Sequence, residues 1–230
     1  AKRILAEAET AADGHEYLIR KCLQIESYWR GLRCISIAKA QELIDQAQIK
    51  QDDECGQVLR GKGRLLVVPL TDSTGAVWSV QFIDETGKKI FLKGGRKKGL
   101  MWCPDGIGLD AGAAGVIGIA EGVATAMSVT KLYDVPCVAA IDAGNLSPAA
   151  ETMRERFPNH ALAFYADRDP SGVGEEKARE AALMLQGRGA QCLVYVPPFT
   201  PEIDADFTRR TGKAPTDFND FWIWWSVIDD

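Results

Sequence analysis

The sequence is poor in the residues that most often hold zinc and in the segments that cross membranes. It has two histidines and six cysteines, and no two cysteines stand in the CxxC spacing of a zinc knuckle, so we expect no zinc in this chain. No apolar run approaches the ~20 residues that a membrane helix needs. No secretory segment is recognisable either, which favours a cytoplasmic protein with free thiols and no membrane partner.

The sequence also lacks an overall positive charge. Its net charge of −5 excludes a protein coated in positive charge, but it does not exclude a local patch that binds nucleic acid. Between Gly87 and Gly99 there are six basic residues and no acidic one: Lys88, Lys89, Lys93, Arg96, Lys97 and Lys98. Neutralisation of phosphates by such residues dominates non-specific affinity for nucleic acids. We therefore favour a role in binding nucleic acid or nucleotide over a solvated hairpin whose lysines guard an edge strand.

Apolar periodicity in the first half of the chain changes from helical to extended. Residues 2–50 show helical spacing, and residues 51–63 are polar and punctuated by glycine, as in a linker. Strands are expected at 65–70, 77–83 and 90–92, separated by two turns. This order predicts a small antiparallel meander after a helical lead-in.

The second half alternates strands with helices, which predicts a parallel α/β sheet. The expected strands are 116–120, 137–141, 161–166 and 191–196, and the expected helices are about 122–132, 147–156 and 173–187. An irregular segment from 197 to about 216 precedes a short aromatic helix. The fold class is therefore α/β (α+β overall), with the helices and antiparallel strands in residues 1–112 and the parallel domain in residues 113–230.

Acidic residues follow two of the expected parallel strands. Glu121 follows the first strand, and Asp167 and Asp169 follow the third. Taken alone, Glu121 is also typical of the first turn of a helix and the aspartates are typical of a polar turn. Together they point to one site, because the carboxyl ends of parallel strands border the crevice where open α/β sheets bind ligands. Crowded carboxylates there favour a hard cation such as Mg²⁺, and hence an enzyme acting on phosphates.

These motifs resemble a known family. Glu121-Gly122 followed by Asp167-Arg168-Asp169-Pro170-Ser171-Gly172 resembles the Toprim domain shared by bacterial-type primases, topoisomerases, small nucleases and recombination proteins. The match covers roughly residues 115–196. Upstream, the segments Arg64–Asp72, Val77–Phe82 and Lys93–Gly95 are similar to the amino-terminal subdomain of a primase core. Within the superfamily, the chain therefore looks like a primase of the phage and plasmid type.

A later motif adds two acidic candidates. The segment Thr216-Asp217-Phe218-Asn219-Asp220 resembles the acidic pair with which such primases complete their metal cluster. The resemblance implies that Asp217 and Asp220 are metal ligands beside Glu121, Asp167 and Asp169. From the residues alone, Asp217 is equally well explained as the N-cap of the aromatic helix and Asp220 as an acid of its first turn, so both interpretations stay open.

The resemblance implies a DNA primase catalytic core, which is a nucleotidyltransferase. Such an enzyme copies a single-stranded DNA template into a short RNA primer from ribonucleoside triphosphates, with Mg²⁺ or Mn²⁺ as cofactor. Arg64 and the basic run would contact template or nucleotide, and a replicative helicase or helicase domain would act from outside this chain. Two alternatives remain: a Toprim metal-dependent nuclease, and a non-enzymatic DNA-binding or replication adaptor. The intact acidic set argues against the adaptor.

Overall fold

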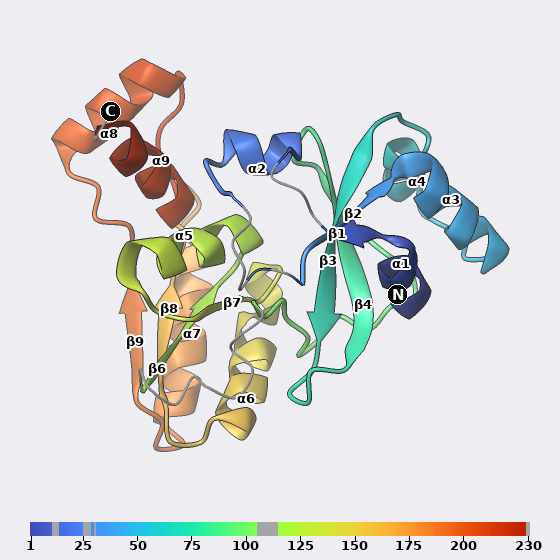
Figure 1. Ribbon diagram of the computed structural model, residues 1–230. Helices are drawn as coiled ribbons and strands as arrows, with labels where there is room; N and C mark the ends of the chain where they lie inside the picture. The colour runs from blue at the N-terminus through green and yellow to red at the C-terminus, as the bar shows by residue number, and fades with distance from the viewer. Residues whose placement is uncertain (11–13, 25–28, 30, 105–114, 229–230) are drawn as a thin grey trace.

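The protein folds around two β-sheets that pack against each other (Figure 1). The computed structural model describes residues 1–10, 14–24, 29, 31–104 and 115–228, and the statements below concern these residues. The predicted domain boundary between residues 112 and 113 lies outside them. The combination of one antiparallel sheet and one parallel sheet confirms the expected fold class.

The first sheet, here called the antiparallel sheet, is a five-stranded meander in the order β1-β2-β3-β4-β5. Its strands are β1 (Glu9–Thr10), β2 (Arg33–Ser36), β3 (Arg64–Thr71), β4 (Val77–Asp84) and β5 (Lys89–Phe91). The meander of the last three strands is confirmed. The expectation of an entirely helical lead-in was wrong, because β1 and β2 extend the sheet beyond β3.

The second sheet, here called the parallel sheet, has the strand order β7-β6-β8-β9, and all its pairings are parallel. Its strands are β6 (Val116–Ala120), β7 (Cys137–Ala139), β8 (Ala161–Tyr165) and β9 (Cys192–Tyr195). All four strands were predicted. Their side chains are mostly buried, as expected for a parallel sheet with helices on both faces.

The helices complete the architecture. They are α1 (Lys2–Glu7), α2 (Glu16–Arg20), α3 (Ile37–Gln46), α4 (Asp53–Leu59), α5 (Val123–Tyr133), the short η2 (Ala143–Asn145), α6 (Leu146–Arg156), α7 (Val173–Gln186), α8 (Pro201–Thr211) and α9 (Phe218–Ile228). Among the described residues, none of the helices has the length and apolar character needed to span a membrane. All six cysteines are free thiols.

Two of these helices correct the sequence analysis. The expected linker at 51–63 contains α4, whose N-cap Asp52 accepts a hydrogen bond from the Cys55 amide at 2.9 Å. The expected irregular segment contains α8, which is capped by the Thr200 hydroxyl and begins at Pro201. Proline counts as a helix breaker in a sequence pattern, yet it is well suited to the first position of a helix because it has no amide hydrogen to leave unsatisfied.

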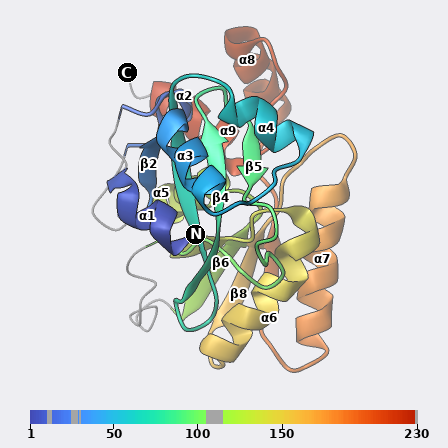
Figure 2. The same ribbon diagram turned by 90° about the vertical axis from the view of Figure 1, so that its right-hand side faces the viewer.

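The two sheets are covered in layers. Helices α1, α3 and α4 cover the outer face of the antiparallel sheet, as the side view shows (Figure 2). Its inner face, which includes Leu66 and Val68, shares a core with α5 and with Ala120 and Ala139 of the parallel sheet. Helices α6 and α7 cover the opposite face of the parallel sheet. The two halves of the protein therefore share one apolar core.

Residues 100–102, which follow the antiparallel sheet in the chain, are hydrogen-bonded to both sheets. The Thr71 amide donates to the Met101 carbonyl at 2.9 Å, and Trp102 and Ala139 exchange two backbone hydrogen bonds of 3.0 Å. The buried Asn145 side chain donates to the carbonyls of Leu100 and Ala140, both at 2.7 Å. These bonds fix how the carboxyl edge of the parallel sheet faces the strands of the other sheet.

Candidate active site

The candidate site lies where the strand order of the parallel sheet reverses. Glu121 directly follows β6 and Asp167 follows the neighbouring β8 by two residues. The next helices, α5 and α7, pack on opposite faces of the sheet. Such a reversal leaves a crevice outside the carboxyl ends of the strands, and this is where open α/β sheets bind ligands.

A cleft of about 300 Å³ occupies this position. Its acidic lining residues are Glu121, Asp167 and Asp217, and its basic lining residues are Arg20, Lys21 and Lys89. The remaining lining residues are Tyr17, Thr86, Gly87, Gly122, Ala124 and Thr125. The carboxylates come from the parallel sheet and the start of α9, whereas the cations come from α2, the residue after it, and β5.

Burial disfavours the ionised form of all three carboxylates in the cleft. Burial, and after it the charges of Asp217 and Glu121, raise the pKa of Asp167 to about 8, against the opposing effect of Lys89. Burial likewise raises the pKa of Glu121, against the opposing effect of Lys89. The pKa of Asp217 is raised by burial and then by the carboxylate of Asp220. Burial is thus the largest influence at all three carboxylates, and it makes their ionised forms costly unless a positive charge lies beside them.

This arrangement fits a bound cation. Asp167 Oδ1 is buried and has no hydrogen-bond partner among the described residues. A cation would supply that missing partner and would relieve the repulsion between the carboxylates. Within the described part of the chain, however, no three acidic, histidine or cysteine side chains already form a metal-binding group. The side chains would therefore need to move closer together around the ion.

The other two predicted ligands have different surroundings. Asp169 accepts hydrogen bonds from the Ser171 amide at 2.8 Å, from the Ser171 hydroxyl, and from the Gly174 amide at 3.2 Å. The Ser171 hydroxyl is the main reason that its pKa is lowered. Asp220 is buried and pairs with Lys213 at 2.8 Å, and it accepts from the Thr216 amide at 2.9 Å. Neither side chain lines the cleft.

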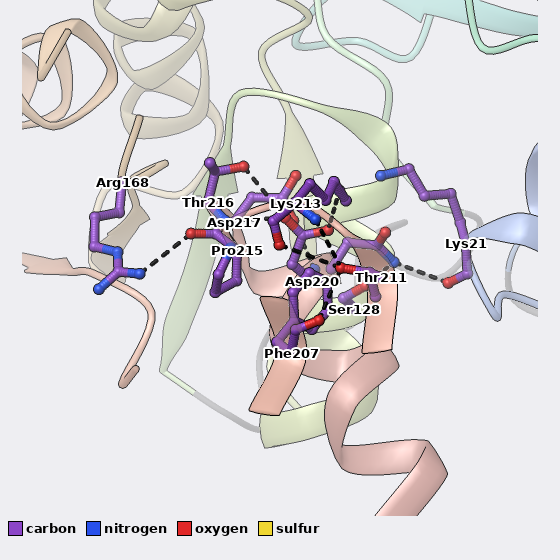
Figure 3. Close-up of polar contacts among 11 residues, drawn as sticks. Lys21, Ser128, Arg168, Phe207, Thr211, Lys213, Pro215, Thr216, Asp217 and Asp220 are labelled. Carbon is purple, nitrogen blue, oxygen red and sulfur yellow. Dashed lines mark hydrogen bonds and ion pairs between the residues drawn. The ribbon is translucent and has the colours of Figure 1, made fainter. Parts of the chain in front are cut away.

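Helix α9 begins beside the cleft, and Figure 3 shows the polar contacts around its start. Asp217 Oδ1 accepts a hydrogen bond from the Asp220 amide at 2.7 Å, so Asp217 caps the helix and also lines the cleft. The buried Asn219 amide donates to the Lys21 carbonyl at 2.9 Å and to the Ser128 hydroxyl at 3.0 Å. Lys21 and Ser128 approach the start of α9 from one side and Arg168 from the other. The motif at 216–220 thereby ties α2 and α5 to the acidic edge of the cleft.

The predicted basic residues do not form one continuous stripe. Only Lys89 lines the cleft. Lys97 pairs with Asp142 at 2.5 Å, Arg96 lies over the Trp78 ring, and Lys93 and Lys98 are exposed. Lys88 is half-buried in the turn just before β5. Arg64 donates to the Gly14 carbonyl at 2.7 Å and lies 3.9 Å from Glu85, away from the cleft.

Sequence reasoning missed three residues near the site. Arg20 and Lys21 line the cleft, but they lie in the helical lead-in, to which the sequence analysis gave no role at the site. Asp142, whose charge raises the pKa of Glu121, follows Ile141, a β-branched residue with φ of 81°. That backbone conformation is unfavourable for such a side chain, and strain of this kind is often found at functional sites. The Ile141 amide donates to the Glu121 carbonyl at 2.7 Å, which fixes the turn beside Glu121.

Comparison with known proteins agrees with this geometry. Residues 116–224 match the Toprim domain family. The chain is also 33% identical over 157 residues to the DNA primase TraC of Escherichia coli. That match covers 61% of this chain and 15% of TraC, so the chain spans only a small part of that relative's length.

Solved structures show the same fold over nearly the whole chain. The DnaG primase catalytic domain bound to ssDNA superimposes with a TM-score of 0.59 at 14% identity, covering 98% of this chain and 76% of that one. The RNA polymerase domain of Mycobacterium tuberculosis primase DnaG gives a TM-score of 0.58 at 16% identity, covering 91% and 75%. The resemblance to a Toprim primase core found in the sequence is confirmed.

Proposed function

We propose that the chain is the catalytic core of a DNA primase, a nucleotidyltransferase that makes short RNA primers on single-stranded DNA. The observation that carries the proposal is the cleft in which Glu121, Asp167 and Asp217 face Arg20, Lys21 and Lys89. Acidic and basic side chains facing each other suit a substrate that brings both phosphate charge and metal ions. The likeness of the fold to primase cores and the sequence match to TraC support the same reading.

In the proposed reaction, the 3′-hydroxyl oxygen of the growing primer bonds to the α-phosphorus of a ribonucleoside triphosphate. The bond from that phosphorus to the bridging oxygen breaks, pyrophosphate leaves, and the hydroxyl proton passes to solvent. Bound Mg²⁺ or Mn²⁺ would neutralise charge on the triphosphate and lower the pKa of the hydroxyl. Glu121, Asp167 and Asp217 are the first candidates for ligands because they line the cleft. Asp169 would join them on releasing Ser171, and Asp220 on releasing Lys213.

The basic residues of the chain have a separate part in the proposal. Lys89 offsets the charge of both Glu121 and Asp167. It would therefore reduce the repulsion between these two carboxylates before substrate binds. Arg20 and Lys21 line the same cleft and would attract the phosphates of the nucleotide or the template. Arg64 is a weaker candidate for such contact, since its guanidinium group is already engaged outside the cleft.

A primer-synthesis assay tests the proposal. It would combine mixed-sequence single-stranded DNA, four labelled ribonucleotides and Mg²⁺ or Mn²⁺ with the wild type, Asp167→Asn and Asp134→Asn. Asp134 is an exposed acid in the left-handed region at the end of α5, which asparagine also tolerates, so it is a matched control. We expect short RNA from the wild type and from Asp134→Asn, and little from Asp167→Asn.

Other outcomes would identify a rival function. Cleavage of the DNA without RNA synthesis, abolished by the same substitution, would favour the Toprim nuclease. DNA binding with neither synthesis nor cleavage under any metal would favour the adaptor. A helicase partner outside this chain remains part of the proposal, and co-purification with a replicative helicase would support it.

A further inference from the structure

An exposed tryptophan on the antiparallel sheet is held in a fixed orientation. Trp102 and Trp29 are fully buried, whereas Trp78, in β4, is 53% exposed. Its indole Nε1 donates to Asp72 Oδ2 at 2.6 Å. Asp72 is fixed in turn, because its other oxygen accepts from the Thr74 hydroxyl at 2.7 Å and from the Thr74 and Ala76 amides. The ring is therefore ordered before any ligand arrives.

The basic run lies directly against this ring. The Arg96 guanidinium carbon is 4.8 Å from the centre of the Trp78 ring, within the range of a cation–π contact. Gly95 makes the approach possible, because a Cβ atom at this position would collide with the Ser79 hydroxyl beside Trp78. A glycine is thus needed at position 95, where the chain passes close to β4. This close approach places the Arg96 guanidinium group against the Trp78 indole.

The same loop connects the indole to the candidate active site. Lys97, the next residue after Arg96, pairs with Asp142 at 2.5 Å, and the charge of Asp142 acts on Glu121 in the cleft. Lys93 and Lys98 on this loop are exposed to solvent. The loop that carries Arg96 against Trp78 is therefore fixed at Lys97 by an acidic residue whose charge acts on the cleft.

We propose that Trp78 and Arg96 form a stacking platform for a base of single-stranded DNA outside the catalytic cleft. Single strands are bound without sequence preference where aromatic rings stack on bases and cations follow the phosphates. Trp78 supplies the ring, Arg96 keeps it in place and reaches a neighbouring phosphate, and Lys93 and Lys98 lie along the strand. The identity of the strand as template rests on the proposed function, but the binding itself does not.

Equilibrium binding of short oligothymidylate, followed by fluorescence anisotropy without nucleotides or divalent metal, tests the platform. Trp78→Ala should raise Kd about tenfold, within the range known for one base stacked on an aromatic side chain. Trp78→Phe should recover part of the loss. Trp225→Ala is the matched control, because Trp225 is 49% exposed but lies on α9, away from the basic loop, and we expect no change in Kd.

A second ligand isolates stacking from charge. An abasic strand of the same length keeps the phosphates and removes the bases, so Trp78→Ala should leave its Kd unchanged while Arg96→Gln still weakens it. Equal binding of oligothymidylate by Trp78→Ala and the wild type would overturn the platform. So would an equal loss with the abasic strand, or the absence of single-strand binding by the wild type. Because no catalysis is measured, inactivity in primer synthesis would leave this result standing.

Discussion

The two sheets bring opposite charges to the cleft. The parallel sheet presents Glu121 and Asp167 at the ends of neighbouring strands, and the antiparallel half presents Lys89 from β5 with Arg20 and Lys21 from the α2 region. The difference follows from sheet geometry, because only the parallel sheet brings the same ends of successive strands to one edge. The parallel sheet is suited to placing several metal-binding carboxylates close together. The β4–β5 hairpin is suited to placing a basic side chain, here Lys89, opposite them.

Asp217 caps α9 and also lines the cleft, so a substitution there can separate a structural role from a role in catalysis. Asparagine caps helices about as well as aspartate, so Asp217→Asn should keep α9 while removing a charge from the cleft. We expect primer synthesis to fall about 10²-fold or more, the scale of losing one preorganised electrostatic group. Steady-state RNA synthesis, with a thermal melt to confirm folding, measures both effects.

Asp220→Asn is the comparison for that variant. Its carboxylate pairs with Lys213 and does not line the cleft, so its loss should cost about 1–3 kcal/mol of folding stability and less activity than Asp217→Asn. If the two variants lost equal activity at equal melting temperature, Asp220 would have to be counted among the metal ligands.

Divalent metal should stabilise the carboxylate side of the cleft. At 100 times its Kd, a metal that binds only the folded state adds about 2.7 kcal/mol, which for a chain of this size is a rise of about 5–10 °C in Tm. Thermal melts with Mg²⁺ or Mn²⁺ measure this shift. In Asp167→Asn the shift should largely vanish, and Asp134→Asn should retain it. An unchanged Tm in the wild type at millimolar metal would contradict the assigned ligand set.

Without metal, the same carboxylates should make stability fall as the pH rises. The pKa of Asp167 is about 8 in the folded protein and about 3.9 in an unfolded chain, so the folded state binds the extra proton between these values. The free energy of unfolding should therefore decrease from about pH 4 to about pH 8. Urea titrations in a chelating buffer measure this, and Asp167→Asn should be more stable than the wild type at pH 8. A wild type with no pH dependence there would contradict the burial of Asp167.

The smallest expected effect concerns the cations outside the cleft. Lys98 is exposed on the basic loop, so Lys98→Ala should lower the slope of log K against log salt for single-stranded DNA by about one. Arg64→Ala should leave that slope unchanged because the guanidinium group is bonded to Gly14 and Glu85. Binding titrations at several salt concentrations separate the two, and a reduced slope for Arg64→Ala would restore Arg64 as a phosphate contact.

The parallel sheet and two of its acidic residues were predictable from the sequence. Long apolar runs mark buried strands, and the position of Glu121 and Asp167 after such runs already places them at one edge. The strands β1 and β2 were missed because two and four residues are too few to show a period. The sequence could not predict that Asp169 and Asp220 would not line the cleft. Their carboxylates are bound by Ser171 and Lys213 instead, and no spacing rule reveals these contacts.

Sequence patterns also could not predict that the α2 region contributes residues to the cleft. Arg20 and Lys21 line the cleft, and the Lys21 backbone is held there by Asn219, near the other end of the chain. Hydrophobic periodicity reports on neighbours along the chain, and it carries no information about a partner 198 positions away.

That single hydrogen bond has a consequence for how the protein is made. The carbonyl of Lys21 leaves the ribosome long before Asn219 is synthesised, and at about 5–20 residues per second the delay is roughly 10–40 s. During that interval the strands β3 to β8 can pair, but the α2 segment lacks the residue that anchors it. A nascent chain should therefore place Glu121, Asp167 and Lys89 first. Asp217 and the anchored Arg20 and Lys21 should follow only when α9 has been made.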